Sequence, residues 1–447
     1  MKRSGDIMPT FRGYQMRVLN TAGRACLVVW LTTISLAAQQ AARPAAVVDT
    51  AASAGIARDR LARLHAAMKG FVDRKEVSGI VTLIARDGKT VDVHAVGQAD
   101  VEKNVAMKTD SIFRIASMTK PVTSVAIMML FEENKLFLTD SVSKFIPAFK
   151  GTQVLEDGKP VAARRQMTIR DLLTHRSGLT YGFLNGGAVG NGYRNNGIVD
   201  GLSQTPLTLE DNINKLAAEP LIAQPGAAFN YSLSTDVLGR VVEVASGQPL
   251  NVFFRERIFK PLKMVDTDFV VPESKWPRLV NVYSPDGKGG IRPMSDPETF
   301  GNTLMSPFAS YREGKTYFSG GAGLVSTAAD YSRFANMLLN GGVLDGARLL
   351  SPKSIELMTS NHTADVPHPL SLIGAGREFG LGVQVVTDVA ATQTLGSVGM
   401  YGWSGIYGTV FWVDPKEKLV SIMMVQKYPG STVAGTFLPM VYQSLVR

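Results

Sequence analysis

The sequence predicts an α/β protein of the α+β type: an antiparallel sheet built from both ends of the chain and flanked by helices, with a mostly helical subdomain inserted. Apolar runs typical of strands occur at 80–96 and return at 381–425. Between them, several segments have apolar residues at helical spacing. We expect a cleft between the sheet and the insertion, where binding sites commonly form.

The first elements of the chain are a helix and a hairpin. An amphipathic helix is predicted over about 56–75, because apolar residues return every three or four positions among charges, at Leu61, Leu64, Met68 and Phe71. Two apolar runs then flank Asp87-Gly88, a turn signal typical of hairpins, at Ile80–Ala85 and Val91–Val96.

The rest of the chain supplies helices and then the remaining strands. A long helix is predicted from about Ser117 to Glu133, whereas the Gly/Asn-rich segment 185–201 is predicted to be a surface loop. Three further strands are expected near the C-terminus, at 381–387, 408–413 and 419–425. A final helix is predicted over 433–446.

The composition is that of a globular protein, since 45% of the 447 residues are hydrophobic and only 19% are charged. We expect one domain over 56–447. Its α/β part is expected at about 56–116 and 300–447, and its helical part at about 117–299.

The N-terminus has the features of a targeting segment. The basic start of residues 1–40 is followed by the apolar stretch Ala25–Ala38, which is too short for a membrane span. We predict a signal peptide over 1–40, with an uncleaved anchor as the alternative, and an Ala/Pro-rich linker over 41–55. The protein is expected to be exported, periplasmic or secreted, with no stable membrane insertion after leader removal. Cys26, the one cysteine, lies within the leader, so no disulfide is expected.

The charge balance argues against nucleic acid as a partner. Residues 1–40 hold five of the 47 basic residues but one of the 38 acidic ones, and no later cluster of Lys and Arg follows. Metal and cofactor sites are not expected either, because the five histidines have no ligand spacing and no complete phosphate-binding loop occurs.

A Ser-x-x-Lys motif is the strongest candidate for chemistry. Ser117 and Lys120 stand at a predicted helix start marked by Pro121, so they share a face and the amine can reach the hydroxyl. A lysine can activate a serine when its surroundings favour the neutral amine. However, a second copy, Ser141 to Lys144, looks like an ordinary capped, charged helix start. The tetrapeptide alone therefore fits a cap as well as a catalytic pair.

The wider context resembles the serine β-lactamase/penicillin-binding superfamily, specifically class C β-lactamases and family VIII carboxylesterases. Five ordered segments carry the resemblance: 113–121 (FRIASMTKP), 172–179 (LLTHRSGL), 229–232 (FNYS), 319–324 (SGGAGL) and 401–413 (YGWSGIYGTVFWV). It extends from about residue 60 to the C-terminus and implies the class C β-lactamase fold.

The resemblance also implies catalytic roles. Ser117 would be the acylated nucleophile and Lys120 its partner, while the Tyr231 hydroxyl would act with the lysine as general base. The backbone N–H groups of Ser117 and Ile406 would form the oxyanion hole.

Substrate contacts are implied for Trp403, Ser404, Gly405 and Leu233. Trp403-Ser404-Gly405 stands where β-lactamases have Lys-Thr/Ser-Gly and is similar to the Trp-Gly-Gly of family VIII esterases. Gly405 would let the substrate approach the strand closely. Leu233 replaces the family's usual Asn, which removes an amide from the expected site. Both changes favour uncharged esters over lactams that carry a carboxylate.

The sequence therefore predicts a serine hydrolase that cleaves small carboxylic esters through an acyl-enzyme on Ser117. One alternative keeps the fold and changes the reaction to that of a β-lactamase or D-alanyl-D-alanine peptidase, and another passes the acyl group to a second alcohol. The alternative of another class is a non-catalytic penicillin-binding or sensing protein. A small-molecule ester is the expected partner, with β-lactams as the second candidate.

Overall fold

The computed structural model describes residues 50–369 and 372–447. The predicted signal peptide at 1–40 and residues 41–49 of the predicted linker lie outside the described residues, so export and leader removal stay predictions. Within the described ranges, no helix is both long enough and apolar enough to span a bilayer.

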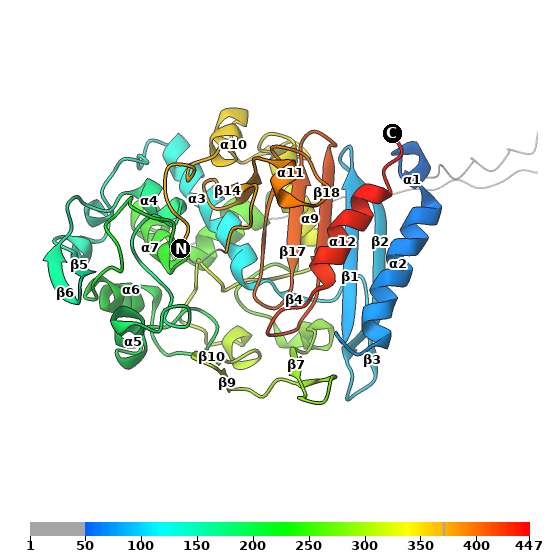
Figure 1. Ribbon diagram of the computed structural model, residues 1–447, viewed down its shortest axis with the longest axis horizontal. Coiled ribbons are helices and arrows are strands. Elements are labelled where there is room, and N and C mark those ends of the chain that lie inside the picture. The colour runs from blue at the N-terminus through cyan, green and yellow to red at the C-terminus, as the bar shows by residue number, and fades with distance from the viewer. Residues whose placement is uncertain (1–49, 370–371) are drawn as a thin grey trace, which may run out of the picture. The chain divides into compact units, whose positions relative to one another are not determined.

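One eight-stranded antiparallel sheet joins the two ends of the chain (Figure 1). Its strands, in spatial order, are β14 (Arg377–Phe379), β15 (Gln384–Val386), β16 (Tyr401–Ser404), β17 (Val410–Asp414), β18 (Leu419–Met424), β1 (Gly79–Arg86), β2 (Lys89–Asp100) and β3 (Val105–Ala106). The N-terminal strand β1 pairs with β18 from Val81↔Met424 to Arg86↔Leu419. This pairing confirms the predicted sheet made from both termini.

Helices cover both faces of the sheet, which explains why all eight residues of β1 are buried. Alternate side chains of a strand point to opposite faces. Ile80 and Ile84 pack into a core with α2 and α12, whereas Val81 and Leu83 belong to the larger core that includes α9. Figure 1 shows α12 beside α2 along one side of the strands. The helices are α1 (Thr50–Ser53), α2 (Arg58–Asp73), α9 (Ala328–Leu339) and α12 (Val433–Gln443).

The insertion is mostly helical, as predicted. Its central element is α3, whose residues 119–130 are all buried and which packs against α7. The helices are α3 (Thr119–Glu132), α4 (Ile169–Leu173), α5 (Ala188–Asn195), α6 (Leu209–Ala217), α7 (Ser234–Ser246) and α8 (Leu250–Phe254), followed by a π-helical turn (Arg255–Phe259). Short hairpins accompany them: β5 (Gln153–Glu156) with β6 (Lys159–Ala162), β7 (Tyr283–Pro285) with β8 (Ile291–Pro293), and β9 (Glu298–Phe300) with β10 (Thr303–Met305).

The prediction of a surface loop over 185–201 is wrong in part, because α5 lies within it. Val189 and Tyr193 are buried on one side of this helix, a tertiary contact that outweighs the low helix propensity of its glycines. The remaining elements are β4 (Phe113–Arg114), β11 (Val325–Ser326), β12 (Val343–Leu344), β13 (Ala347–Arg348), α10 (Pro352–Met358), α11 (Val389–Thr392) and 3₁₀ turns at Ala116–Met118, Val142–Lys144, Pro147–Phe149, Glu273–Arg278 and Ala309–Tyr311.

Candidate active site

Ser117 lies on a tight turn between a strand pair and the central helix. β4 pairs with β11, and the 3₁₀ turn Ala116–Met118 leads directly into α3. Ala116 has a φ of 40°, which a residue with a Cβ seldom adopts and which costs conformational energy. Ala116 and Met118 are buried, while Ser117 between them lines a pocket. The strained turn thus holds this hydroxyl at the pocket wall.

Lys120 contacts Ser117 as its spacing predicts. The side chain is 1% exposed. Its Nζ donates to Ser117 Oγ at 3.1 Å, to the Tyr181 hydroxyl at 3.0 Å and to the Gly321 carbonyl at 2.8 Å. Three polar partners thus hold the Lys120 amine in one position beside the Ser117 hydroxyl.

Tyr231 reaches the same pocket with its ring turned toward the lysine. Lys120 Nζ lies 4.7 Å from the centre of the Tyr231 ring, a cation–π distance. The Tyr231 hydroxyl accepts a hydrogen bond from Trp403 Nε1 at 3.3 Å. Among the described residues, this hydroxyl makes no hydrogen bond to Ser117 or Lys120. The three predicted residues are therefore brought together, and the tyrosine contacts the lysine through its ring.

Tyr181 is a member of the site that the sequence reasoning missed. It follows the 172–179 segment after one residue, lines the pocket and accepts the hydrogen bond from Lys120. Burial, together with Tyr231 and Asp236, raises the pKa of Tyr181 well above its usual value, so the hydroxyl keeps its proton. The signal that could have found it is its place next to a motif that the family resemblance had already marked.

The end of β16 forms the opposite wall. Trp403, Ser404, Gly405 and Ile406 all line the pocket together with Ser117. The indole of Trp403 packs against Tyr231, with ring centroids 5.5 Å apart, while its N–H donates to that residue's hydroxyl. Trp403 therefore both lines the pocket and orients the tyrosine.

Packing gives a second reason for a glycine at position 405, besides the predicted close approach of substrate. A Cβ at this position would lie 2.4 Å from the carbonyl oxygen of Ile115 and 2.4 Å from Thr409 Oγ1. The missing side chain thus lets the strand end pack directly on the backbone that leads into Ser117. This close packing places the peptide of Ile406 beside the nucleophile turn.

Leu233 does not contribute to this pocket. Its side chain is 1% exposed in the core, and the residue immediately precedes α7. An amide is nevertheless present, because Gln384 on β15 lines the pocket. Gln384 is not adjacent to any of the motifs in the sequence, so only strand pairing with Gly402 brings it to the site.

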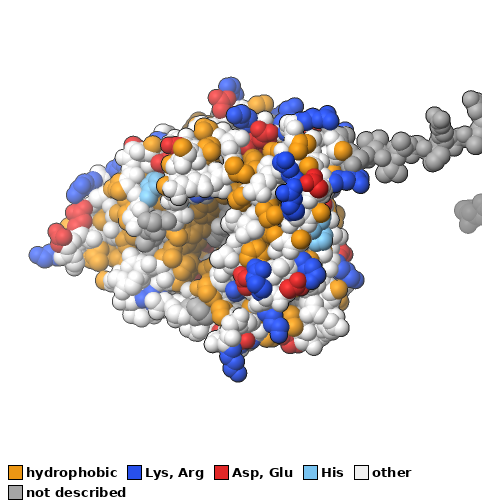
Figure 2. Space-filling view, turned by 45° about the vertical axis from the view of Figure 1, so that its right-hand side comes forward, with side chains coloured by type: hydrophobic (Ala, Val, Ile, Leu, Met, Phe, Trp, Pro, Cys, Tyr) orange, Lys and Arg blue, Asp and Glu red, His pale blue; other side chains and the backbone are white. Residues whose placement is uncertain are grey.

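The pocket is an apolar cavity of about 260 Å³. Figure 2 shows a hollow on one face of the protein, with hydrophobic side chains gathered around it. Hydrocarbon and aromatic side chains make up most of the wall: Tyr181, Phe183, Leu184, Leu202, Tyr231, Ala322, Leu372, Trp403, Ile406 and Trp412. No lysine or arginine is among the described lining residues.

A buried carboxyl group supports the site from behind. Asp236 on α7 accepts hydrogen bonds from the Tyr317 hydroxyl at 2.9 Å and from Ser319 Oγ at 2.6 Å. Burial raises the pKa of Asp236, and the nearby Lys120 opposes that effect. Because Ser319 and Gly321 belong to one loop, this carboxyl group anchors the loop whose carbonyl accepts from Lys120.

The comparisons with known proteins identify the family of this chain. Residues 64–436 match the family described as Beta-lactamase. The chain belongs to the β-lactamase family. It is therefore a hydrolase with the serine β-lactamase fold, as the five sequence segments predict.

Several known proteins match most of this chain at 31% to 36% identity. Protein Rv1367c of Mycobacterium tuberculosis is 36% identical over 383 residues, which cover 83% of this chain and 90% of that protein. Esterase EstB of Burkholderia gladioli is 33% identical over 377 residues, covering 83% and 91%. The solved structure of EstCE1, described as a hydrolase with promiscuous acyltransferase activity, has 31% identity and a TM-score of 0.76, covering 87% and 99%.

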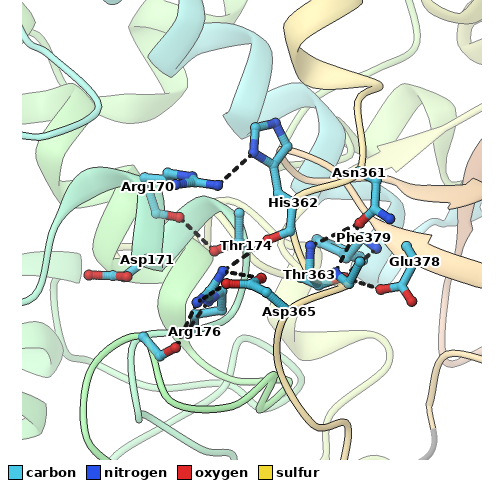
Figure 3. A network of polar contacts seen from close by, with 12 residues as sticks. Arg170, Asp171, Thr174, Arg176, Asn361, His362, Thr363, Asp365, Glu378 and Phe379 are labelled. Atoms are coloured by element: carbon cyan, nitrogen blue, oxygen red, sulfur yellow. Dashed lines mark hydrogen bonds and ion pairs between the residues drawn. The ribbon is translucent and has the colours of Figure 1, made fainter.

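A polar network holds the family segment 172–179 against the C-terminal part of the chain (Figure 3). The Arg176 guanidinium donates to both carboxylate oxygens of Asp365, at 2.9 and 3.1 Å. Thr363 Oγ1, two residues before Asp365, accepts from the backbone N–H of Phe379 at 2.9 Å. The Phe379 ring meets Trp403 edge to face at 5.1 Å. These contacts connect the family segment 172–179 with the strands that carry Trp403 and the pocket wall.

His175 is a packing residue and not a catalytic base. It follows the C-cap of α4 with a φ of 53°, as expected for a residue that ends a helix. Its ring lies 4.7 Å from that of Tyr231, and Nδ1 is 3.3 Å from Ser232 Oγ. Burial and the nearby Lys120 hold the pKa of His175 well below its usual value, so the imidazole is neutral.

Proposed function

We propose that this hydrolase is a carboxylesterase that forms an acyl-enzyme on Ser117. The observation that carries the proposal is the 3.1 Å contact between Lys120 Nζ and Ser117 Oγ at the wall of an apolar pocket. A buried lysine otherwise costs free energy, which a catalytic role would justify.

In the acylation step, Ser117 Oγ attacks the carbonyl carbon of the ester, and its proton passes to the Lys120 amine. The bond between the carbonyl carbon and the alcohol oxygen then breaks, and the alcohol leaves with the proton. Tyr181 and Gly321 keep the amine in line with the serine throughout, because both accept from it.

In the deacylation step, a water molecule attacks the acyl-serine ester. Tyr231 and Lys120 act together as the base that takes the water proton, and the proton returns to Ser117 Oγ as the carboxylic acid departs. Trp403 supports this role by donating to the Tyr231 oxygen, which steadies the phenol as it takes part in proton transfer. The N–H groups of Ser117 and Ile406 would bind the oxyanion in both steps.

Two features favour neutral esters over β-lactams that carry a carboxylate. Trp403 occupies the strand position of the β-lactamase lysine, and the described pocket wall holds no lysine or arginine to pair with a carboxylate. The name of one relative points the same way, since EstB is called an esterase, whereas more distant relatives at 27% identity are named putative D-alanyl-D-alanine carboxypeptidases. Acyl transfer to a second alcohol is the other candidate, because EstCE1 is described as having that activity.

The test compares hydrolysis of p-nitrophenyl acetate, p-nitrophenyl octanoate and a chromogenic cephalosporin by the wild type and Ser117→Ala. We expect ester hydrolysis that depends on Ser117. Adding methanol in competition with water would reveal acyl transfer as methyl ester formation. Faster turnover of the cephalosporin than of either ester would overturn the esterase assignment, and unchanged activity in Ser117→Ala would overturn the acyl-enzyme.

A further inference from the structure

Asp200 is the one acidic residue among the described residues of the pocket wall. Its carboxylate Oδ1 accepts from the backbone N–H of Leu202 at 3.0 Å. No lysine, arginine or histidine among the described residues forms an ion pair with it. Asp200 is partly buried in this apolar wall, and a partly buried carboxylate without a cation is costly in a protein.

The surrounding charges do not supply a partner. Burial raises the pKa of Asp200 to about 6, Asp236 acts in the same direction, and Lys120 opposes it. Lys120 already donates to three acceptors. The other titratable groups near the carboxylate are the hydroxyls of Tyr181, Tyr317 and Tyr407, which are neutral at physiological pH. Above its pKa, Asp200 therefore presents a negative charge in the pocket.

The backbone around Asp200 is held firmly by contacts on both sides. Val199 exchanges two hydrogen bonds with the side chain of Asn212, both at 2.9 Å. The carbonyl of Leu202 accepts from the Ser306 N–H at 2.8 Å. Because the backbone is anchored at Val199 and at Leu202, these hydrogen bonds fix the position of the Asp200 carboxyl group between them.

Gly201 brings this segment close to the loop behind the nucleophile. It has a φ of 84°, and a Cβ there would lie 2.4 Å from Ser319 Oγ. Ser319 in turn donates to Asp236. The segment of Asp200 is thus packed on the same loop that supplies the Gly321 carbonyl to Lys120.

The aromatic residues of the pocket wall suit a cation that carries hydrocarbon substituents. Aromatic rings from Phe183, Trp403 and Trp412 line the same pocket, and aromatic faces attract cations. A carboxylate together with aromatic rings favours an ammonium group and repels a second carboxylate.

We propose that Asp200 selects esters that carry an ammonium group, in either the acyl or the alcohol part, over esters of the same shape without charge. This inference rests on the proposed esterase function and specifies its substrate class. Asp200 also repels the carboxylate of a β-lactam, which reinforces the effect of Trp403.

The experiment uses two pairs of esters that differ only by a quaternary nitrogen or a carbon. The first pair, p-nitrophenyl 5-(trimethylammonio)pentanoate and p-nitrophenyl 6,6-dimethylheptanoate, places the charge in the acyl part. The second pair, acetylcholine and 3,3-dimethylbutyl acetate, places it in the alcohol. The quaternary charge does not titrate, so any change of preference with pH comes from the protein.

We expect kcat/KM to favour the cationic member of at least one pair by about 10-fold or more. Asp200→Asn keeps the size of the side chain and the acceptor for Leu202, and we expect it to abolish the preference. Asp157→Asn, which removes an exposed carboxyl group from a turn, is the matched control and should leave the preference intact. In the wild type the preference should fall as the pH drops from 8 to 5, because Asp200 becomes protonated near pH 6.

Binding without turnover separates this inference from the proposed function. Calorimetry on Ser117→Ala with 5-(trimethylammonio)pentanoate methyl ester needs no catalysis, and the Ser117→Ala/Asp200→Asn double variant should bind it about 10-fold more weakly. If neutral esters are hydrolysed but neither pair shows a preference, or Asp200→Asn retains it, the selectivity inference is wrong. If no ester is hydrolysed, the esterase proposal fails, and equal binding by the two variants would then overturn the role of Asp200 as well.

Discussion

The two Ser-x-x-Lys segments of this chain have the same spacing and entirely different surroundings. Lys120 is buried and contacts Ser117, whereas the side chain of Lys144 is 51% exposed and pairs with Asp140 at 2.8 Å. Ser141 precedes a 3₁₀ turn without a side-chain cap, so the expected capping hydrogen bond is absent at this second copy. The comparison shows that a Ser-x-x-Lys segment becomes a candidate catalytic pair only where tertiary contacts bury the lysine beside its serine.

Replacing each of the two serines separately should give the largest difference in activity between the two segments. Ser117→Ala should lower kcat for p-nitrophenyl acetate by about 10⁴-fold or more, because the acyl-enzyme cannot form. Ser141→Ala should change it by less than about 2-fold, since Ser141 is not among the described residues that line the pocket and its hydroxyl accepts from Ser143. Steady-state kinetics and melting curves of both variants provide the check. Comparable losses in the two variants would refute the distinction between the segments.

Replacing the lysines should give the next largest difference. Lys120→Met retains the apolar stem but removes the proton acceptor, and we expect kcat to fall by about 10³-fold. Lys144→Met loses one exposed ion pair with Asp140, worth well under about 1 kcal/mol, and should leave turnover unchanged. Burst kinetics would report acylation directly. Normal acylation by Lys120→Met would remove the lysine from the mechanism.

Replacing the two tyrosines near Lys120 should separate their roles beside Ser117. We expect Tyr231→Phe to reduce kcat by about 10²-fold or more because the base for deacylation is lost. Tyr181→Phe removes one acceptor from the lysine and should cost about 10-fold. Single-turnover measurements separate acylation from deacylation in each variant. A larger loss in Tyr181→Phe would reverse the assignment of the two hydroxyl groups.

The smallest expected effect is on stability, and it comes from the packing of Gly405 against the backbone that leads into Ser117. Gly405→Ala would place a Cβ against the Ile115 carbonyl, and we expect the free energy of unfolding to fall by about 2 kcal/mol. Gly430→Ala is the matched control, because nothing lies within 4 Å of a Cβ there. Urea unfolding of both variants measures the difference. Equal stability would show that the strand end does not press on the nucleophile turn.

Local patterns predicted much of the fold. The hairpin at Asp87-Gly88, the helix that begins after Ser117 and the terminal strands are confirmed, because each depends on apolar periodicity and turn residues that are adjacent in the chain. The loop predicted over 185–201 is wrong in part: its glycines suggested a loop throughout, whereas burial of Tyr193 stabilises α5 within it. Tertiary packing decided that element.

The sequence by itself determined the family, the sheet made from both termini and the spacing that lets Lys120 reach Ser117. Only the tertiary structure decided that Tyr181 is the tyrosine hydroxyl bonded to that lysine, that Leu233 is buried outside the pocket, and that Gln384 and Asp200 line it. The physical reason is separation along the chain. A motif specifies neighbours three or four residues apart, whereas the polarity of a pocket depends on side chains that strand pairing and loop anchoring bring from distant segments.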